Sequence, residues 1–214
     1  MQIQLRQVVK RFGAQTVLDG VTFDVDTAER VIILGQNGAG KTTLLRCLLG
    51  HYRLDEGEVR LAGFDPVRKR RQALSEVAFI PQLPPPLPVS IEALIRYAHE
   101  TTGTNPRLVK DYAARFGLDV ERHLAKPFNQ LSGGMKQKFL ASLAFARGAR
   151  IMLFDEPTAN LDPEGREAFR TILQEDPFRE TTMIFISHRI EELNTILNRA
   201  VWLDLGKVVN DERL

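Results

Sequence analysis

Apolar and polar residues alternate along several stretches near the start of the chain. The alternation covers residues 3–5 and residues 21–25, and a period of two is typical of strands with one buried face. It returns at residues 59–61, after a turn-like segment at residues 55–57. This part of the chain is therefore predicted to be rich in β-strands.

Three later stretches are continuous apolar runs, at residues 31–34, 151–154 and 183–186. Such runs are typical of central strands in a parallel sheet that is covered on both faces. The first two runs are each followed by a turn and then a helical pattern, which is the βα order of an α/β core.

Apolar residues at helical spacing follow the first of these runs and dominate the middle of the chain. Residues 91–98 and 135–146 each place an apolar stripe on one helix face. We interpret residues 83–149 as a helical subdomain inserted into a core formed by residues 1–82 and 150–214, so that residues 1–214 form one domain. The prolines at its entrance, within residues 84–88, are interpreted as a rigid connector rather than as a peptide ligand.

Composition excludes several classes of protein. The chain has 214 residues with 43% hydrophobic and 26% charged residues, and its net charge of +2 gives no argument for a nucleic-acid partner. Its single cysteine, Cys47, allows no internal disulfide or cysteine-based zinc site, and we expect it to be buried and inert. No secretory signal is visible at the N-terminus, and no apolar run approaches the ~18 residues that span a bilayer. We expect a cytoplasmic chain that reaches a membrane only through a partner.

The segment between the first apolar run and the following helix reads GQNGAGKT, residues 35–42. Its glycines let the backbone turn its N–H groups toward phosphate oxygens, and the helix directs its positive end at the same anion. This is the Walker A pattern, in which Lys41 reaches the β- and γ-phosphates and Thr42 binds Mg²⁺. No Asn-Lys-x-Asp run for guanine is present, so we expect ATP. The predicted nucleotide-binding residues here are Gly35, Gln36, Asn37, Gly38, Ala39, Gly40, Lys41, Thr42 and Thr43.

A second apolar strand ends in two carboxylates, Asp155 and Glu156. Alone this could be an ordinary acidic turn, but with the phosphate loop it predicts a Walker B site. Asp155 is expected to hold Mg²⁺ directly or through water, and Glu156 to polarise the attacking water as general base.

A third motif, Ser132-Gly133-Gly134, lies 23 residues before Asp155. The first two motifs leave several P-loop families open, including small-molecule kinases. Ser and Gly before a helix make another anion-binding helix start, which a kinase does not need. Taken alone the segment would be a helix cap, but its place in the chain favours function.

With these residues in order, nearly the whole chain resembles an ATP-binding cassette (ABC) ATPase, and Leu131–Gly134 resembles the family signature. Four further family elements match: the adenine-stacking aromatic, the glutamine that links the γ-phosphate site to the helical lobe, the D-loop and the switch histidine. They correspond to Phe12, Gln82, Asp162 within residues 159–162, and His188. Each also has a structural alternative: a core aromatic, a loop amide, a helix cap and a helix-start residue.

The resemblance implies an α/β fold, with a P-loop NTPase core, an N-terminal antiparallel β-subdomain and an inserted helical subdomain. It implies Mg²⁺ held by Thr42, Gln82 and Asp155, and catalysis by Glu156, His188 and Lys41. It also implies a head-to-tail dimer, most simply a homodimer, with each ATP between the Walker A loop of one chain and the Ser132 signature of the other. An integral membrane permease would dock on the helical lobe and hold the dimer at the inner face of the membrane.

One residue departs from the family pattern. Met135 follows the two signature glycines where glutamine is usual, and Gln137 comes two residues later. This variant resembles cassettes of exporter-type (ABC-2) systems, so export is expected. Two other functions stay open: a soluble cassette in a non-transport assembly, and a nucleotide-gated scaffold without turnover, against which Glu156 and His188 argue.

Overall fold

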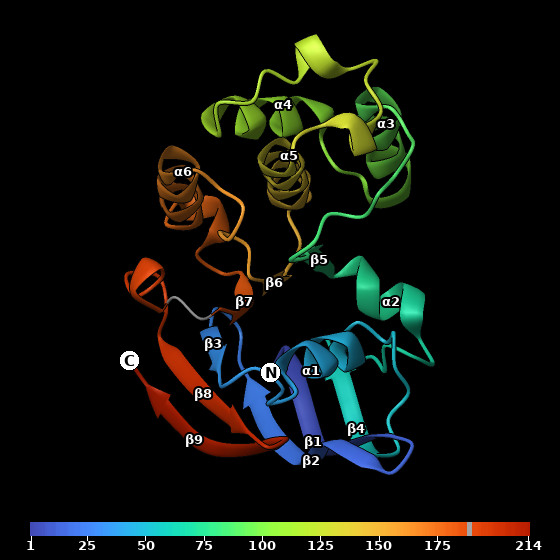
Figure 1. Cartoon of the computed structure of the whole chain (residues 1–214), viewed down its shortest axis with the longest axis vertical. Coiled ribbons are helices and arrows are strands. Elements are labelled where there is room, and N and C mark those ends of the chain that lie inside the picture. Colours follow the sequence, from blue (N-terminus) through green and yellow to red (C-terminus); the bar gives the residue numbers. More distant parts are fainter. Residues whose placement is uncertain (188–189) are drawn as a thin grey trace. The chain divides into compact units, whose positions relative to one another are not determined.

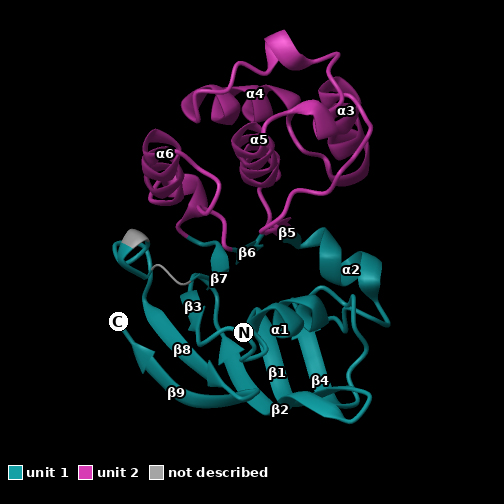
Figure 2. Ribbon diagram, viewed as in Figure 1, with its two compact units in different colours: residues 1–77, 150–155, 180–214 teal, residues 78–149, 156–179 magenta. Residues whose placement is uncertain are grey.

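The computed structural model describes residues 1–187 and 190–214. These residues form two compact units (Figure 2). The first unit consists of Met1–Val77, Arg150–Asp155 and Glu180–Leu214, and the second of Ala78–Ala149 and Glu156–Arg179.

An antiparallel sheet begins the first unit, as the alternating pattern predicts. Its strands are β1 (Ile3–Phe12), β2 (Gln15–Val25) and β4 (Glu56–Leu61), in the order β2-β1-β4. The alternate residues Ile3, Leu5 and Val25 are fully buried, because one face of each strand covers the core.

The second sheet of this unit confirms the predicted parallel strands. Five of its strands lie within this unit: β3 (Arg30–Leu34), β6 (Ile151–Asp155), β7 (Thr182–Ile186), β8 (Arg199–Asp204) and β9 (Lys207–Arg213). They follow the order β6-β7-β3-β8-β9; the first four are parallel and β9 is antiparallel (Figure 1). Helices α1 (Lys41–Leu48) and α2 (Arg70–Ser75) and the short turn η4 (Ile190–Glu192) belong to the same unit, and β5 (Val77–Ile80) begins at its boundary.

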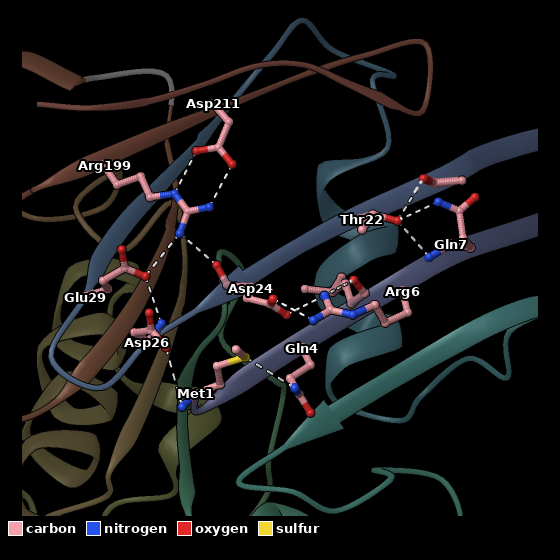
Figure 3. A network of polar contacts seen from close by, with 12 residues as sticks. Met1, Gln4, Arg6, Gln7, Thr22, Asp24, Asp26, Glu29, Arg199 and Asp211 are labelled. Carbon is pink, nitrogen blue, oxygen red and sulfur yellow. Dashed lines mark hydrogen bonds and ion pairs between the residues drawn. The ribbon is translucent and has the colours of Figure 1, made fainter.

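A charged network joins strands of both sheets in the first unit (Figure 3). The Arg199 guanidinium on β8 forms two bonds of 2.7 Å with the Asp211 carboxylate on β9. Its third nitrogen donates to the Asp24 carbonyl of β2 at 2.7 Å and to Glu29 at 3.1 Å. A bidentate pair of this kind fixes orientation as well as distance, so Arg199 fastens β2 to the edge of the second sheet.

The second unit is helical, as expected for the inserted segment. Its helices are α3 (Ile91–Thr102), α4 (Pro106–Arg115), α5 (Gly133–Ala146) and α6 (Pro163–Leu173), with short turns η1 (Glu121–His123), η2 (Phe128–Gln130) and η3 (Asp176–Phe178). The four helices begin at side-chain caps: Ser90, Asn105, Ser132 and Asp162.

The second unit also contains residues 156–179, which the sequence interpretation placed with the core. Aromatic packing accounts for this grouping. The ring centroid of Phe169 on α6 lies 5.5 Å from that of Phe145 on α5, and the Phe178 centroid lies 5.3 Å from Phe145. Helix α5 is also buried on more faces than the predicted single stripe: Met135 and Leu143 are only half-buried, whereas Gln137 and Ser142 are fully buried.

The prediction for Cys47 is confirmed. The side chain is buried, and desolvation raises the pKa of its thiol to about 11, so little reactive thiolate forms at neutral pH. Among the described residues, no helix is both long enough and apolar enough to cross a membrane.

Candidate functional site

The predicted phosphate loop lies between β3 and α1, at the carboxyl end of a parallel strand. Its backbone takes the left-handed conformation at Gly35, Gly38 and Gly40, with φ of 149°, 86° and 104°. A Cβ on Gly35 would lie 2.2 Å from the Leu203 carbonyl oxygen, and one on Gly40 would lie 2.8 Å from that of Val17. Glycine is therefore required here both by conformation and by close packing.

Helix α1 begins without a side-chain cap, because its N-cap residue is Gly40. The Lys41 side chain is only 7% exposed. Its ammonium donates to the carbonyl oxygens of Gly35 at 2.6 Å and Gln36 at 3.0 Å, so the loop curls around a positive charge. An uncapped helix start beside a held ammonium can bind phosphate oxygens.

Asp155 lies at the same edge of the sheet as this loop. In the strand register Asp155 pairs with Ile186 of β7, and Ile186 pairs with Ile33 of β3. Two strand spacings then separate Asp155 from the end of β3, a distance of about 10 Å. Phosphate and its counter-ion can both lie between these points. Ser187 directly follows β7 at this edge and is buried, whereas His188 lies outside the described residues.

Phe12 lies at the end of β1 and is 43% exposed, so the alternative of a core aromatic is not supported. Its ring meets Tyr52 edge to face at a centroid distance of 5.2 Å, and the Lys10 ammonium lies 5.2 Å from its centroid. Tyr52 is held in turn by Arg46, which donates to its hydroxyl at 2.8 Å. Phe12 is thus an exposed ring fixed from one side, with surface left for stacking.

We predict that Phe12→Ala weakens ATP binding while Phe12→Tyr does not. Stacking of a base on an aromatic ring contributes about 1–3 kcal/mol, so the dissociation constant should rise roughly five- to 150-fold. Calorimetric titration with ATP measures the effect. Tripolyphosphate, which has no base, should bind both variants alike; an equal loss for both ligands would contradict stacking.

Glu156 belongs to the second unit and has an unusual backbone. Its φ is 48°, although it is not glycine and precedes Pro157, and such strain is typical of functional positions. A turn holds the conformation, since the Ala159 N–H donates to the Glu156 carbonyl at 3.2 Å. The carboxyl group is thus placed at a bend directly after β6.

The predicted signature begins α5. The Ser132 hydroxyl oxygen accepts from the Met135 N–H at 3.2 Å, so the cap alternative is confirmed. The same hydroxyl still has its own proton to donate. Ser132 and Gly133 are exposed and no acidic residue lies in the first turn, an arrangement that can bind an anion supplied from outside the chain.

Side chains of the D-loop join the other predicted segments of the second unit. Asp162 caps α6 by accepting from the Gly165 N–H at 2.7 Å, and it accepts from the Lys138 ammonium of α5 at 2.7 Å. These bonds, that to Lys138 first, hold the pKa of Asp162 below its usual value. The Asn160 amide donates to the Gln82 carbonyl at 3.3 Å. The D-loop, the Gln82 segment and the start of α5 therefore form one hydrogen-bonded cluster.

The donor set fits magnesium in part within the first unit. The Thr42 hydroxyl and the Asp155 carboxylate are oxygen ligands of the kind Mg²⁺ prefers, and Mg²⁺ is usually completed by phosphate oxygens and water. The described residues contain no group of three or more His, Cys, Asp or Glu side chains that could hold a metal ion by itself. Gln82 belongs to the second unit.

Each unit thus contains one set of predicted residues. The first contains the phosphate loop, Phe12 and Asp155; the second contains Gln82, Glu156 and Asp162 with the signature. Sequence reasoning did not assign Tyr52, Lys138 or the buried Gln137 to these sets. A signal for Gln137 was available, because it shares a helix face with the alanines at positions 141 and 144, where a polar residue is unexpected.

Comparison with known proteins identifies a family to which this chain is similar. The profile of the ABC transporter family matches residues 18–159. The cell division ATP-binding protein FtsE of Streptococcus pneumoniae is 32% identical, covering 98% of this chain and 95% of the relative. The Nod factor export ATP-binding protein I of Burkholderia thailandensis is 33% identical, covering 97% and 69%. The sulfate/thiosulfate import ATP-binding protein CysA of Bradyrhizobium diazoefficiens is 34% identical, covering 97% and 62%.

Solved structures agree with this result. An ATP-binding subunit of an ABC transporter is 26% identical, with a TM-score of 0.92 over 100% of this chain and 90% of that chain. A cassette solved as a dimer in a post-hydrolysis state with ADP and Pi shares the fold, at 23% identity and a TM-score of 0.86 over 99% and 98% of the two chains. With its phosphate loop, acidic strand end and signature in family order, the chain belongs to the ABC transporter family, whose ATP-binding cassettes are ATPases.

Proposed function

We propose that this chain is the ATP-hydrolysing subunit of an ABC transporter and powers translocation by a separate membrane subunit. One observation carries the proposal: the chain has two helix starts suited to phosphate, one at α1 and one at α5, that belong to different units. Two such starts meet on one γ-phosphate most simply across a two-fold interface between chains.

In this proposal ATP lies between the Walker A loop of one chain and the Ser132 signature of the other. Lys41 exchanges its bonds with the loop carbonyls for bonds with the β- and γ-phosphates, and the α1 amides bind the same oxygens. Phe12 stacks on adenine. Mg²⁺, held by Thr42, Asp155 and Gln82, supplies charge neutralisation at the phosphates.

Hydrolysis requires a base next to the γ-phosphate. Glu156 fits this role because the bend after β6 presents its carboxylate beyond the end of the strand, where it can take a proton from the attacking water. His188 is proposed, from the family resemblance, to contact the γ-phosphate. Loss of that phosphate removes the contact that closes the dimer, so ATP acts as a reversible switch.

The membrane subunit and the inner face of the cell membrane belong to the proposal as well. Relatives named for transport support them. For direction we propose export, on the strength of the Met135 signature variant and the Nod factor export relative, although CysA is named for import. The alternative function is that of a soluble cassette in a non-transport assembly.

Co-purification tests the proposal. The Glu156→Gln chain, tagged and expressed in its source cells, is captured from detergent-solubilised membranes. We expect an integral membrane protein to be captured with it in stoichiometric amount. The Lys41→Met chain should lose no more of this membrane protein during purification than the wild-type chain does. Recovery of the chain only from the soluble fraction, with ribosomal or nucleic-acid components, would favour the alternative function. Reconstitution of the captured complex in vesicles, with ATP added on one side, then gives the direction.

A further inference from the structure

A buried amide on α5 bridges two loops of the second unit. The Gln137 side chain is 0% exposed. Its Nε2 donates to the carbonyl oxygen of Pro81 at 3.3 Å and to that of Pro157 at 3.3 Å. Gln137 lies on the first turns of the signature helix, and both acceptors belong to other segments of the same unit.

The hydrogen-bonding capacity of its two neighbours determines the orientation of this amide. Both neighbours are backbone carbonyls, which only accept, and proline has no N–H to offer in their place. A flipped amide would set its oxygen against two other oxygens. The observed orientation leaves Oε1 without a hydrogen-bond partner among the described residues, so this side chain is held by its two donated bonds.

Each acceptor is the neighbour of a functional residue. Pro81 precedes Gln82, and Pro157 follows Glu156, whose φ of 48° is strained. A strained backbone persists only where its surroundings determine it. The bond to the Pro157 carbonyl is one such determinant, and the bond to Pro81 ties the Gln82 segment to the same atom.

We propose that Gln137 is a positioning residue for ATP hydrolysis: its two amide hydrogens set the distance between the backbone of the Gln82 segment and the backbone of Glu156, and attach both to the signature helix. A shift of the signature helix therefore moves the base and the Gln82 segment together. This inference rests on the roles proposed above for Glu156 and Gln82.

Substitution by methionine tests the idea, because Gln137→Met keeps the length of the side chain and removes both donors. Since the phosphate loop is untouched, the dissociation constant for ATP should stay within about threefold of wild type. The kcat of the purified chain should fall about tenfold or more, because misplacing a reacting group by about 1 Å costs up to about a hundredfold in rate.

Ser142→Ala is the matched control. Ser142 is also fully buried on α5, but its hydroxyl donates within the helix to the Lys138 carbonyl at 2.8 Å. It should keep the wild-type kcat. Wild-type kcat in Gln137→Met, or equal losses in both variants that follow a lowered melting temperature, would overturn the proposal.

A second variant decides the matter even if the methionine variant does not fold. In Gln137→Glu an ionised carboxylate faces two carbonyls, whereas a protonated one donates to one of them. Because even the protonated carboxyl restores only one of the two bonds, the kcat of this variant should stay below that of wild type between pH 6 and 8; a wild-type kcat would contradict positioning. Glu156→Gln, assayed in parallel, separates the outcomes: if it too keeps wild-type kcat, the proposed base is wrong, and if only Gln137 variants are unaffected, this inference alone fails.

Discussion

Glu156→Gln should bind ATP with near wild-type affinity and lose about 10²–10⁴-fold in kcat, the usual contribution of a general base. The amide matches the carboxylate in size, so the bend at φ 48° is kept, but the amide cannot accept the proton of the attacking water. ATP should then persist in the site. We expect an ATP-dependent dimer, measured by light scattering, that does not form with ADP.

Glu164→Gln is the control for this substitution. Glu164 lies in the first turn of α6 and is exposed, so its turnover should be unchanged. If Glu156→Gln turned over ATP at the wild-type rate, another group would have to be the base.

Lys41→Met should lose both ATP binding and turnover. A hydrogen bond to a charged group contributes about 1.5–3 kcal/mol, so the dissociation constant for ATP should rise roughly ten- to 150-fold. The loss of positive charge at the reacting phosphate should lower kcat/KM by a further factor of about 10²–10³. Binding is measured by titration with a fluorescent ATP analogue and turnover by phosphate release.

The fold must be checked in this variant, since the buried ammonium donates to the Gly35 and Gln36 carbonyls and some stability will be lost with it. Thermal unfolding without nucleotide measures that cost. Lys69→Met, which removes an ammonium 5.8 Å from the Phe64 ring centroid, should leave ATP binding unchanged. Full ATP affinity in a folded Lys41→Met chain would show that this lysine does not contact the phosphates.

The strands and the phosphate loop could be predicted because their signals are local. A continuous apolar run such as residues 183–186 is typical of a buried strand. The glycines of residues 35–42 are explained directly by the backbone conformation that a phosphate-binding loop needs. Asp162 was foreseen both as a D-loop residue and as a cap, and it caps α6 through the Gly165 N–H.

Features that depend on distant contacts were not predictable in the same way. The grouping of α6 with the helical unit rests on Phe169 and Phe178 meeting Phe145, and no periodicity reports such a pairing. Gln137 stands out on an otherwise apolar helix face, but nothing in its neighbours along the chain indicates that Pro81 and Pro157 lie beside it. A side chain that bonds to two partners distant in the sequence can be identified only from the folded structure.

The central claim is that one ATP site is shared by two chains, and mixing two inactive variants tests it most directly. Gly133→Asp should fold, since a Cβ there meets nothing within 4 Å and an acidic residue suits a helix start, but its charge would oppose the phosphates of the partner's ATP. Lys41→Met fails in the other half of the site. Each variant alone should be inactive. Mixed in equal amounts, they form dimers with one intact site, so random pairing predicts about a quarter of the wild-type ATPase rate. A mixture no more active than the mean of the two separate variants would contradict the shared site.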